Sequence, residues 1–115
     1  MTIQDVLNEV DELKPNQYKS GTKISWISKI EKKIHDDIIS RQGYDGPPPD
    51  YTRNTDLETV LLAPDAYADL YVYYVISMIE QHNGEIERYR NTSAMFNQLY
   101  INFIGWYYAT HRQKR

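Results

Sequence analysis

Residues 64–108 limit most strongly what this chain can fold into, because they carry two helical periodicities separated by an Asn83-Gly84 dipeptide. Before the dipeptide, apolar and aromatic side chains recur at the three- and four-residue steps that line one face of an α-helix. They are Tyr67, Leu70, Tyr71, Tyr74, Val75, Met78 and His82, with Val72, Ile76 and Ile79 on a second face. Only a narrow stripe stays polar: Asp69, Tyr73, Ser77 and Glu80. A helix that is apolar around most of its circumference needs neighbours on several sides, so this helix is predicted to be the central core element.

A second seam follows the dipeptide, at an alternating spacing of three and four residues. Its members are Ile86, Tyr89, Ser93, Phe96, Tyr100, Phe103 and Tyr107. This spacing gives a long contact surface along one helix. The two helices are therefore predicted to fold back on each other as an antiparallel pair.

The first part of the chain predicts two more helices. Thr2 and Asp5 have the spacing of an N-terminal cap, and an apolar stripe from Ile3 to Leu13 follows, so a short helix is expected to end at Pro15. From residue 23 onward, isoleucines step at helical intervals while lysines and aspartates occupy the other side, which indicates an amphipathic surface helix ending near residues 41–43. Ser20 or Thr22 is expected to cap it.

Residues 43–63 change character, because glycines and three successive prolines, 47–49, interrupt the helical pattern. Prolines in series favour an extended polyproline II path. This run is either a docking segment for an aromatic groove on a partner or a stiff loop without one. Pro64 then suits the first turn of the central helix. The sequence thus predicts a single all-α domain, residues 1–115: a small bundle of about four helices organised around a long C-terminal antiparallel helix pair, with a long Pro-containing loop at 43–63 and a flexible basic tail at 109–115.

The amino-acid composition argues against several classes of protein. The 115 residues include 13 basic and 16 acidic side chains, a net charge of −3, which argues against a generic nucleic-acid binder. The chain has no cysteine, so it has no disulfide, thiolate nucleophile or cysteine-based zinc site, which fits a reducing compartment. The longest apolar run, residues 70–79, is about half of the ~20 residues that a membrane span requires. Since the first residues also lack the pattern of a secretion signal, a cytoplasmic protein without a membrane segment is expected.

Catalytic and metal-binding patterns are absent from the sequence. Asp65 and Asp69 share a helix face, but their place near a helix N-terminus explains them by helix electrostatics. The three histidines, 35, 82 and 111, lie on separate segments without a metal-ligand spacing. No glycine-rich phosphate loop or nucleophile elbow occurs. We therefore expect a protein that is not an enzyme and that holds no cofactor and no metal.

Aromatic and basic residues near the C-terminus are the best candidates for a binding surface. Residues 85–115 carry five basic and two acidic side chains. Trp, Tyr and Arg are the side chains that most often anchor interfaces, although the 11 tyrosines serve core packing equally well. The candidate interface residues are Tyr51, Trp106, Tyr107, Tyr108, His111, Arg112 and Arg115.

Residues 69–91, DLYVYYVISMIEQHNGEIERYRN, resemble the signature region of head-to-tail connector proteins of tailed phages and of prophages in Gram-positive bacteria. The similarity extends to the opening MTIQDVLNEVDELKPNQY, to DYT at 50–52, to LLAPD at 61–65 and to SAMFNQLY at 93–100. None of these strings is a catalytic motif. The resemblance points to a family and not to a chemistry.

The resemblance implies a structural head-completion, or adaptor, protein that takes part in virion assembly. Such subunits form an oligomeric ring, typically of twelve, beneath the portal protein; the ring extends the DNA channel, and a stopper or tail-completion protein docks below it. Their C-terminal segment tends to engage the portal, which corresponds here to residues 106–115. DNA would pass through the lumen without specific binding, and the protein would be found in the host cytoplasm and then in the virion. The isolated subunit is expected to be monomeric and to order residues 43–63 and its tail on assembly.

One alternative comes from another class. The two N-terminal helices could form a small helix-turn-helix DNA-binding protein, with the second helix presenting lysines 23, 29, 32 and 33. The connector of about eight residues is longer than that motif's tight turn. Asp36 and Asp37 would also face the phosphates.

Overall fold

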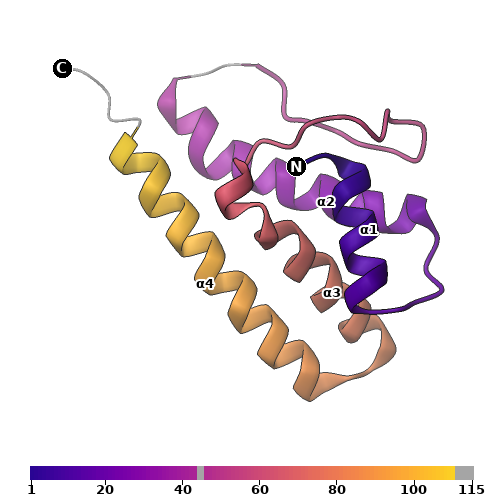
Figure 1. The fold of residues 1–115 in the computed structure, drawn as a ribbon. Helices are drawn as coiled ribbons and strands as arrows, with labels where there is room; N and C mark the ends of the chain where they lie inside the picture. The colour runs from indigo at the N-terminus through magenta and orange to yellow at the C-terminus, as the bar shows by residue number, and fades with distance from the viewer. Residues whose placement is uncertain (44–45, 111–115) are drawn as a thin grey trace.

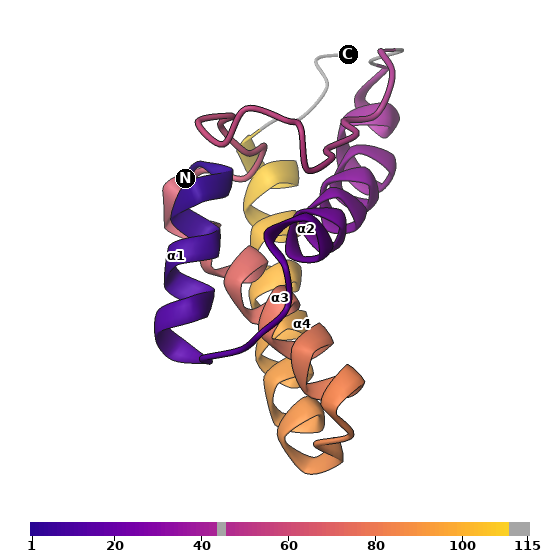
Figure 2. The same ribbon diagram turned by 90° about the vertical axis from the view of Figure 1, so that its right-hand side faces the viewer.

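Four α-helices make up most of the chain in the computed structural model, which describes residues 1–43 and 46–110. They are α1 (Ile3–Leu13), α2 (Ser20–Ile34), α3 (Asp69–Asn83) and α4 (Ile86–Thr110). α3 and α4 form an antiparallel pair. Figure 1 shows α1 and α2 on the α3 side of this pair, and in Figure 2 α1 lies to the left of the pair and α2 to its right. The predicted all-α class and the helix pair are confirmed. Within the described ranges, β-pairing is limited to one isolated bridge between Thr2 and Val60.

The turn between α3 and α4 depends on Gly84. Its φ angle of +75° lies in the left-handed region that favours glycine. The Gly84 N–H donates to the carbonyl of Gln81 at 3.2 Å, and the Glu85 N–H donates to the carbonyl of Glu80 at 2.9 Å. These two bonds satisfy the last carbonyls of α3, as in a Schellman motif. The Asn83-Gly84 dipeptide therefore ends the central helix where the sequence predicts.

The N-terminal cap of α1 is also confirmed. The Asp5 N–H donates to Thr2 Oγ1 at 3.1 Å, and the Thr2 N–H donates to Asp5 Oδ2 at 2.9 Å, which completes a capping box. The prediction for α2 was wrong, because neither Ser20 nor Thr22 caps it. Lys19 is the cap residue and has no side-chain capping bond.

Beyond α2, the helical path continues through a π-helical turn, His35–Ile39, and a 3₁₀ turn, Ser40–Gln42. It ends at Gly43, whose φ angle of +88° again requires the left-handed region. This agrees with the predicted end near residues 41–43. A second 3₁₀ turn, Asp65–Tyr67, leads from Pro64 into α3.

The core lies where α1, α2 and α4 meet α3. Its largest fully buried side chains include Tyr71, Phe103, Ile24, Ile27, Ile30, Leu70 and Ile79. The polar stripe expected on α3 is covered in its second half, because Ser77 and Glu80 are buried. Lys14, just after α1, lies 3.8 Å from Glu80 Oε2, while Glu80 Oε1 has no hydrogen-bond partner among the described residues. Ile86 is exposed at the hairpin end. His82 is also exposed there, and its ring centre lies 5.2 Å from that of Trp26 on α2.

Replacing Gly84 by alanine should lower the free energy of unfolding by about 1 kcal/mol, because alanine is strained at a positive φ. The matched control is Gly105→Ala in α4, where an added Cβ meets no atom within 4 Å. Alanine there should raise stability by about 1 kcal/mol, because glycine is a poor helix former. Urea unfolding of both variants measures the two changes. If both variants change the free energy of unfolding in the same direction, the conclusion that the turn needs glycine at position 84 for its left-handed conformation is wrong.

Candidate functional site

A buried carboxylate, Glu31, joins α2 to α3 and to the long loop. Its side chain comes from the apolar face of α2 and is 0% exposed. Glu31 Oε2 accepts from the Tyr51 hydroxyl at 2.9 Å and from the Leu62 N–H at 3.0 Å. Glu31 Oε1 accepts a short hydrogen bond from the Tyr71 hydroxyl. Tyr71 in turn accepts from the Ala63 N–H at 2.9 Å. One acid thus fixes both ends of the 51–63 segment.

The electrostatics of this cluster follow from burial. Desolvation raises the pKa of Glu31, and the hydrogen bonds from Tyr71, Leu62 and Tyr51 oppose that rise. Burial, reinforced by the Glu31 carboxylate, also raises the pKa of Tyr51 and of Tyr71. Because the folded state holds the Glu31 proton more tightly than the unfolded chain does, this group favours folding most at low pH. Its contribution declines as pH rises through the raised pKa.

Sequence reasoning missed Glu31, although a signal existed. Glu31 lies four residues after Ile27 and one residue after Ile30, inside the isoleucine face of α2. An acid on an apolar face requires partners, because an unpaired buried charge is costly. Tyr51 and Tyr71 are those partners. The cluster consequently has a structural role, since its oxygens are occupied by internal donors.

The loop is also held at further points. The Tyr51 N–H donates to Ser28 Oγ at 2.9 Å, and Asp50 pairs with Lys32 at 2.8 Å. The Ile3 N–H donates to the Thr59 carbonyl at 3.1 Å. Residues 50–63 are therefore attached to the helices by contacts within one subunit, while the gain of order of the 43–63 loop on assembly stays a prediction.

A second polar cluster attaches α4 to the end of the α2 path. The Tyr100 hydroxyl donates to Asp37 Oδ2 at 2.7 Å, and the Tyr108 hydroxyl donates to the Asp37 carbonyl at 2.8 Å. Lys33 lies 3.0 Å from the same carboxylate and 5.3 Å from the centre of the Tyr100 ring. The Tyr100 hydrogen bond, followed by Lys33, holds the pKa of Asp37 below its usual range.

The candidate interface residues separate into two places. Trp106 and Tyr107 are half-buried near the end of α4, where the Trp106 ring centre lies 5.3 Å from that of Tyr67. Tyr108 beside them is 37% exposed. Tyr51 belongs instead to the Glu31 cluster. The remaining candidates, His111, Arg112 and Arg115, lie outside the described residues, as does the tail beyond Thr110, whereas Ala109 and Thr110 belong to α4.

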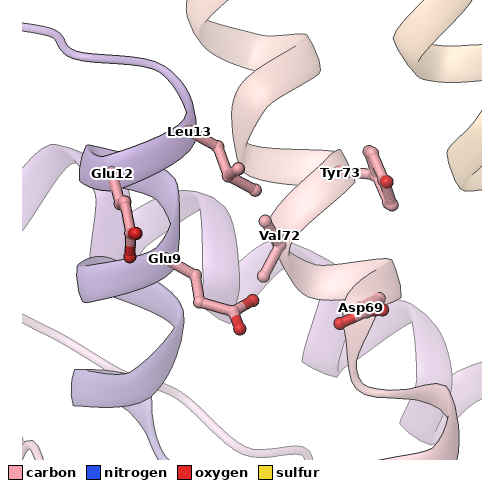
Figure 3. A pocket seen from close by; sticks show the side chains of 6 residues that line it. All are labelled: Glu9, Glu12, Leu13, Asp69, Val72 and Tyr73. Carbon is pink, nitrogen blue, oxygen red and sulfur yellow. The ribbon is translucent and has the colours of Figure 1, made fainter.

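An apolar groove with acidic edges crosses α1, α3 and α4, and we call it the acidic groove. One hollow of about 320 Å³ lies between α1 and α3, and Figure 3 shows its lining. A second hollow of about 320 Å³ lies between α3 and α4 and shares Asp69 and Tyr73 with the first. The apolar side chains include Leu13, which is 63% exposed, and Met95, which is 49% exposed. The acids at the edges are Glu9, Glu12 and Asp69. No basic side chain lines either hollow within the described part of the chain.

A basic surface lies on the exposed side of α2, and we call it the basic face. It consists of Lys19, Lys29 and Arg53, with Thr22 and Ser25 between them. The loop brings Arg53 next to Gly21, since a Cβ at Gly21 would lie 3.2 Å from Arg53 Cβ. None of the three basic side chains forms an ion pair within residues 1–43 and 46–110.

The other lysines of α2 are engaged inside the subunit. Lys23 is buried and lies 2.6 Å from Asp11, while Lys32 and Lys33 pair with Asp50 and Asp37. Of the four lysines in the helix-turn-helix alternative, Lys29 alone is exposed and without an ion pair in the described ranges.

Comparison with protein-family models, with curated proteins and with solved structures found no match to this chain. The connector resemblance of residues 69–91 therefore stays a prediction. Among the residues that the structure describes, no group of acids and histidines could hold a metal ion. In the same residues, no helix combines the length and the hydrophobicity needed to cross a membrane.

Replacing Glu31 by glutamine should lower the free energy of unfolding by about 2 to 3 kcal/mol, because an amide N–H₂ would face hydroxyl and N–H donors. Tyr51→Phe removes a single donor and should cost about 1 kcal/mol. Glu58→Gln makes the same chemical change at an exposed position and should stay within about 0.5 kcal/mol of wild type. Urea unfolding at neutral pH ranks the three variants. An effect of Glu31→Gln no larger than that of Glu58→Gln would contradict the role of the cluster.

Tyr100→Phe should cost about 1 kcal/mol at neutral pH and progressively less in acid. The reason is that the Tyr100 bond stabilises ionised Asp37, whose pKa lies below its ordinary 3.8 in the folded state. That stabilisation is complete above the unfolded pKa and is lost as pH falls through the folded one. Urea unfolding between about pH 7 and pH 3 measures the difference from wild type. Tyr89→Phe, on the same helix but with no hydrogen bond from its hydroxyl to a described residue, is the control and should show no such trend.

Proposed function

We propose that this protein is a head-completion adaptor subunit, which forms a ring beneath the portal, extends the DNA channel and docks a stopper or the tail. The proposal starts from the resemblance of residues 69–91 to head-to-tail connectors. In this role the chain is a structural protein and not an enzyme. Its partners are further copies of itself, the portal protein and a stopper or tail-completion protein.

The aromatic end of α4 is the observation that carries the proposal. Trp106 and Tyr107 are only half-buried, and Tyr108 is 37% exposed, so large rings stay partly open to a partner. The Trp106 ring packs against Phe103 and Tyr67, whose ring centres lie 6.3 and 5.3 Å away. Rigid aromatic side chains held by a packed base make good interface anchors, because little side-chain freedom is lost on binding. The basic residues at 112, 114 and 115 follow directly in the sequence.

The shape and charge of the subunit fit the same role. The described chain is elongated, with extents of 49 × 32 × 20 Å, and α4 runs along it (Figure 1). An elongated subunit leaves separate surfaces for neighbours at its sides and for partners at its ends, as a ring requires. The net charge of −3 suits a channel through which DNA slides, since phosphate contacts by Lys and Arg hold DNA in place.

Binding to the cognate portal tests the proposal. Mixed with that portal, the wild-type chain should form rings that electron microscopy and native mass spectrometry both detect. A variant with Arg112→Gln, Lys114→Gln and Arg115→Gln should bind the portal at least tenfold more weakly, because these charges follow the aromatic anchors closely in the sequence. Its melting temperature should stay close to that of wild type, since the three substitutions leave the sequence of residues 1–110 unchanged.

The matched control changes three other basic residues to glutamine: Arg41, Arg88 and Arg90, all exposed. This variant has the same net charge and should bind the portal like wild type. Absence of any portal complex with the wild-type chain would overturn the proposed function. Equal losses in the two variants would show that general charge, and not the end of α4, governs binding.

A further inference from the structure

The acidic groove and the basic face are two separate surfaces of the subunit that share no residue. The groove is formed by α1, α3 and α4, and in Figure 2 α1 lies to the left of the helix pair and α2 to its right. Residues Thr22, Ser25 and Lys29 are exposed on α2, opposite its buried isoleucines, so this part of the basic face points away from the core. Each surface carries three charges of one sign. The acids at 9, 12 and 69 and the bases at 19, 29 and 53 form no ion pairs within the described residues.

We propose that the basic face of one copy docks into the acidic groove of the next copy, so that subunits associate head to tail. This inference rests on the proposed function and names the two surfaces that would build its ring. A contact between two different surfaces is heterologous, and it propagates from copy to copy until the ring closes. The same contact, repeated around the ring, then pairs the acidic groove and the basic face of every subunit with the opposite charges of its two neighbours.

The chemistry of the two surfaces is complementary beyond net charge. Lysine stems pack along apolar surface while their ammonium groups stay polar. Leu13, Tyr73 and Met95 supply such a surface in the groove, with carboxylates of Glu9 and Asp69 at its edges. The small side chains of Thr22 and Ser25 let the helix backbone of α2 come close to that floor. Matching potentials of this kind set register and speed association more than they add affinity.

Site-directed cross-linking tests the contact directly, because the natural chain has no cysteine. Leu13→Cys places a thiol in the groove, and Ser25→Cys places one on the basic face; both positions are exposed. With a short bis-maleimide, the double variant should form a ladder of covalent oligomers at least tenfold faster than a control pair, Leu13→Cys with Glu58→Cys. Each single variant should stop at dimers. Equal rates for the two pairs would overturn the proposal.

Charge reversal supplies a second readout. In the double-cysteine background, Glu9→Lys with Glu12→Lys should slow the ladder at least tenfold, and so should Lys19→Glu with Lys29→Glu. A mixture of these two variants should restore it, because each then offers the surface that the other lacks. The charge-matched control, Glu58→Lys with Glu87→Lys, should leave the rate unchanged. If the mixture of the two variants does not restore the rate of ladder formation, the two surfaces do not pair directly.

The outcomes separate this inference from the proposed function. If rings form on the portal but the cysteine pair cross-links no faster than the control pair, the adaptor role is supported and the proposed contact is contradicted. If the ladder forms fast and depends on charge but the chain does not bind the portal, the contact is supported and the adaptor role is contradicted.

Discussion

The buried carboxylate of Glu31 is the interaction on which the rest of the structure depends. It accepts hydrogen bonds from Tyr51, Tyr71 and Leu62, so α2, α3 and the returning loop share one polar centre inside an otherwise apolar core. An acid in such a place is tolerated only when its oxygens are occupied. The cluster therefore specifies how three distant parts of the chain meet, and hydrophobic packing supplies the bulk of the stability around it.

The helical framework was predictable because its signals are local. The capping box at Thr2 and Asp5, the left-handed Gly84 and the three-four spacing of Phe96, Tyr100 and Phe103 each depend on residues close together in sequence. Such patterns determine where a helix begins, ends and faces. The antiparallel pair follows from them, since a tight turn between two apolar seams brings those seams together.

What sequence reasoning missed depends on contacts between distant residues. Tyr51 was a candidate interface residue because tyrosine often anchors interfaces, yet its hydroxyl is bound to Glu31. The attachment of residues 50–63 has the same origin, since its hydrogen-bond partners belong to α1, α2 and α3. The acidic groove combines residues from three helices, and no window of sequence contains Glu12, Asp69 and Met95 together.

The unequal lengths of the paired helices have a mechanical consequence. α4 has 25 residues and α3 has 15, so the last turns of α4 extend beyond the start of their partner. There α4 rests on the 3₁₀ turn through Tyr67 and on the π-helical turn that contains Asp37. The last turns of α4 are thus braced by two short, irregular turns and not by the central helix, so the position of the end of α4 depends on the conformation of these turns.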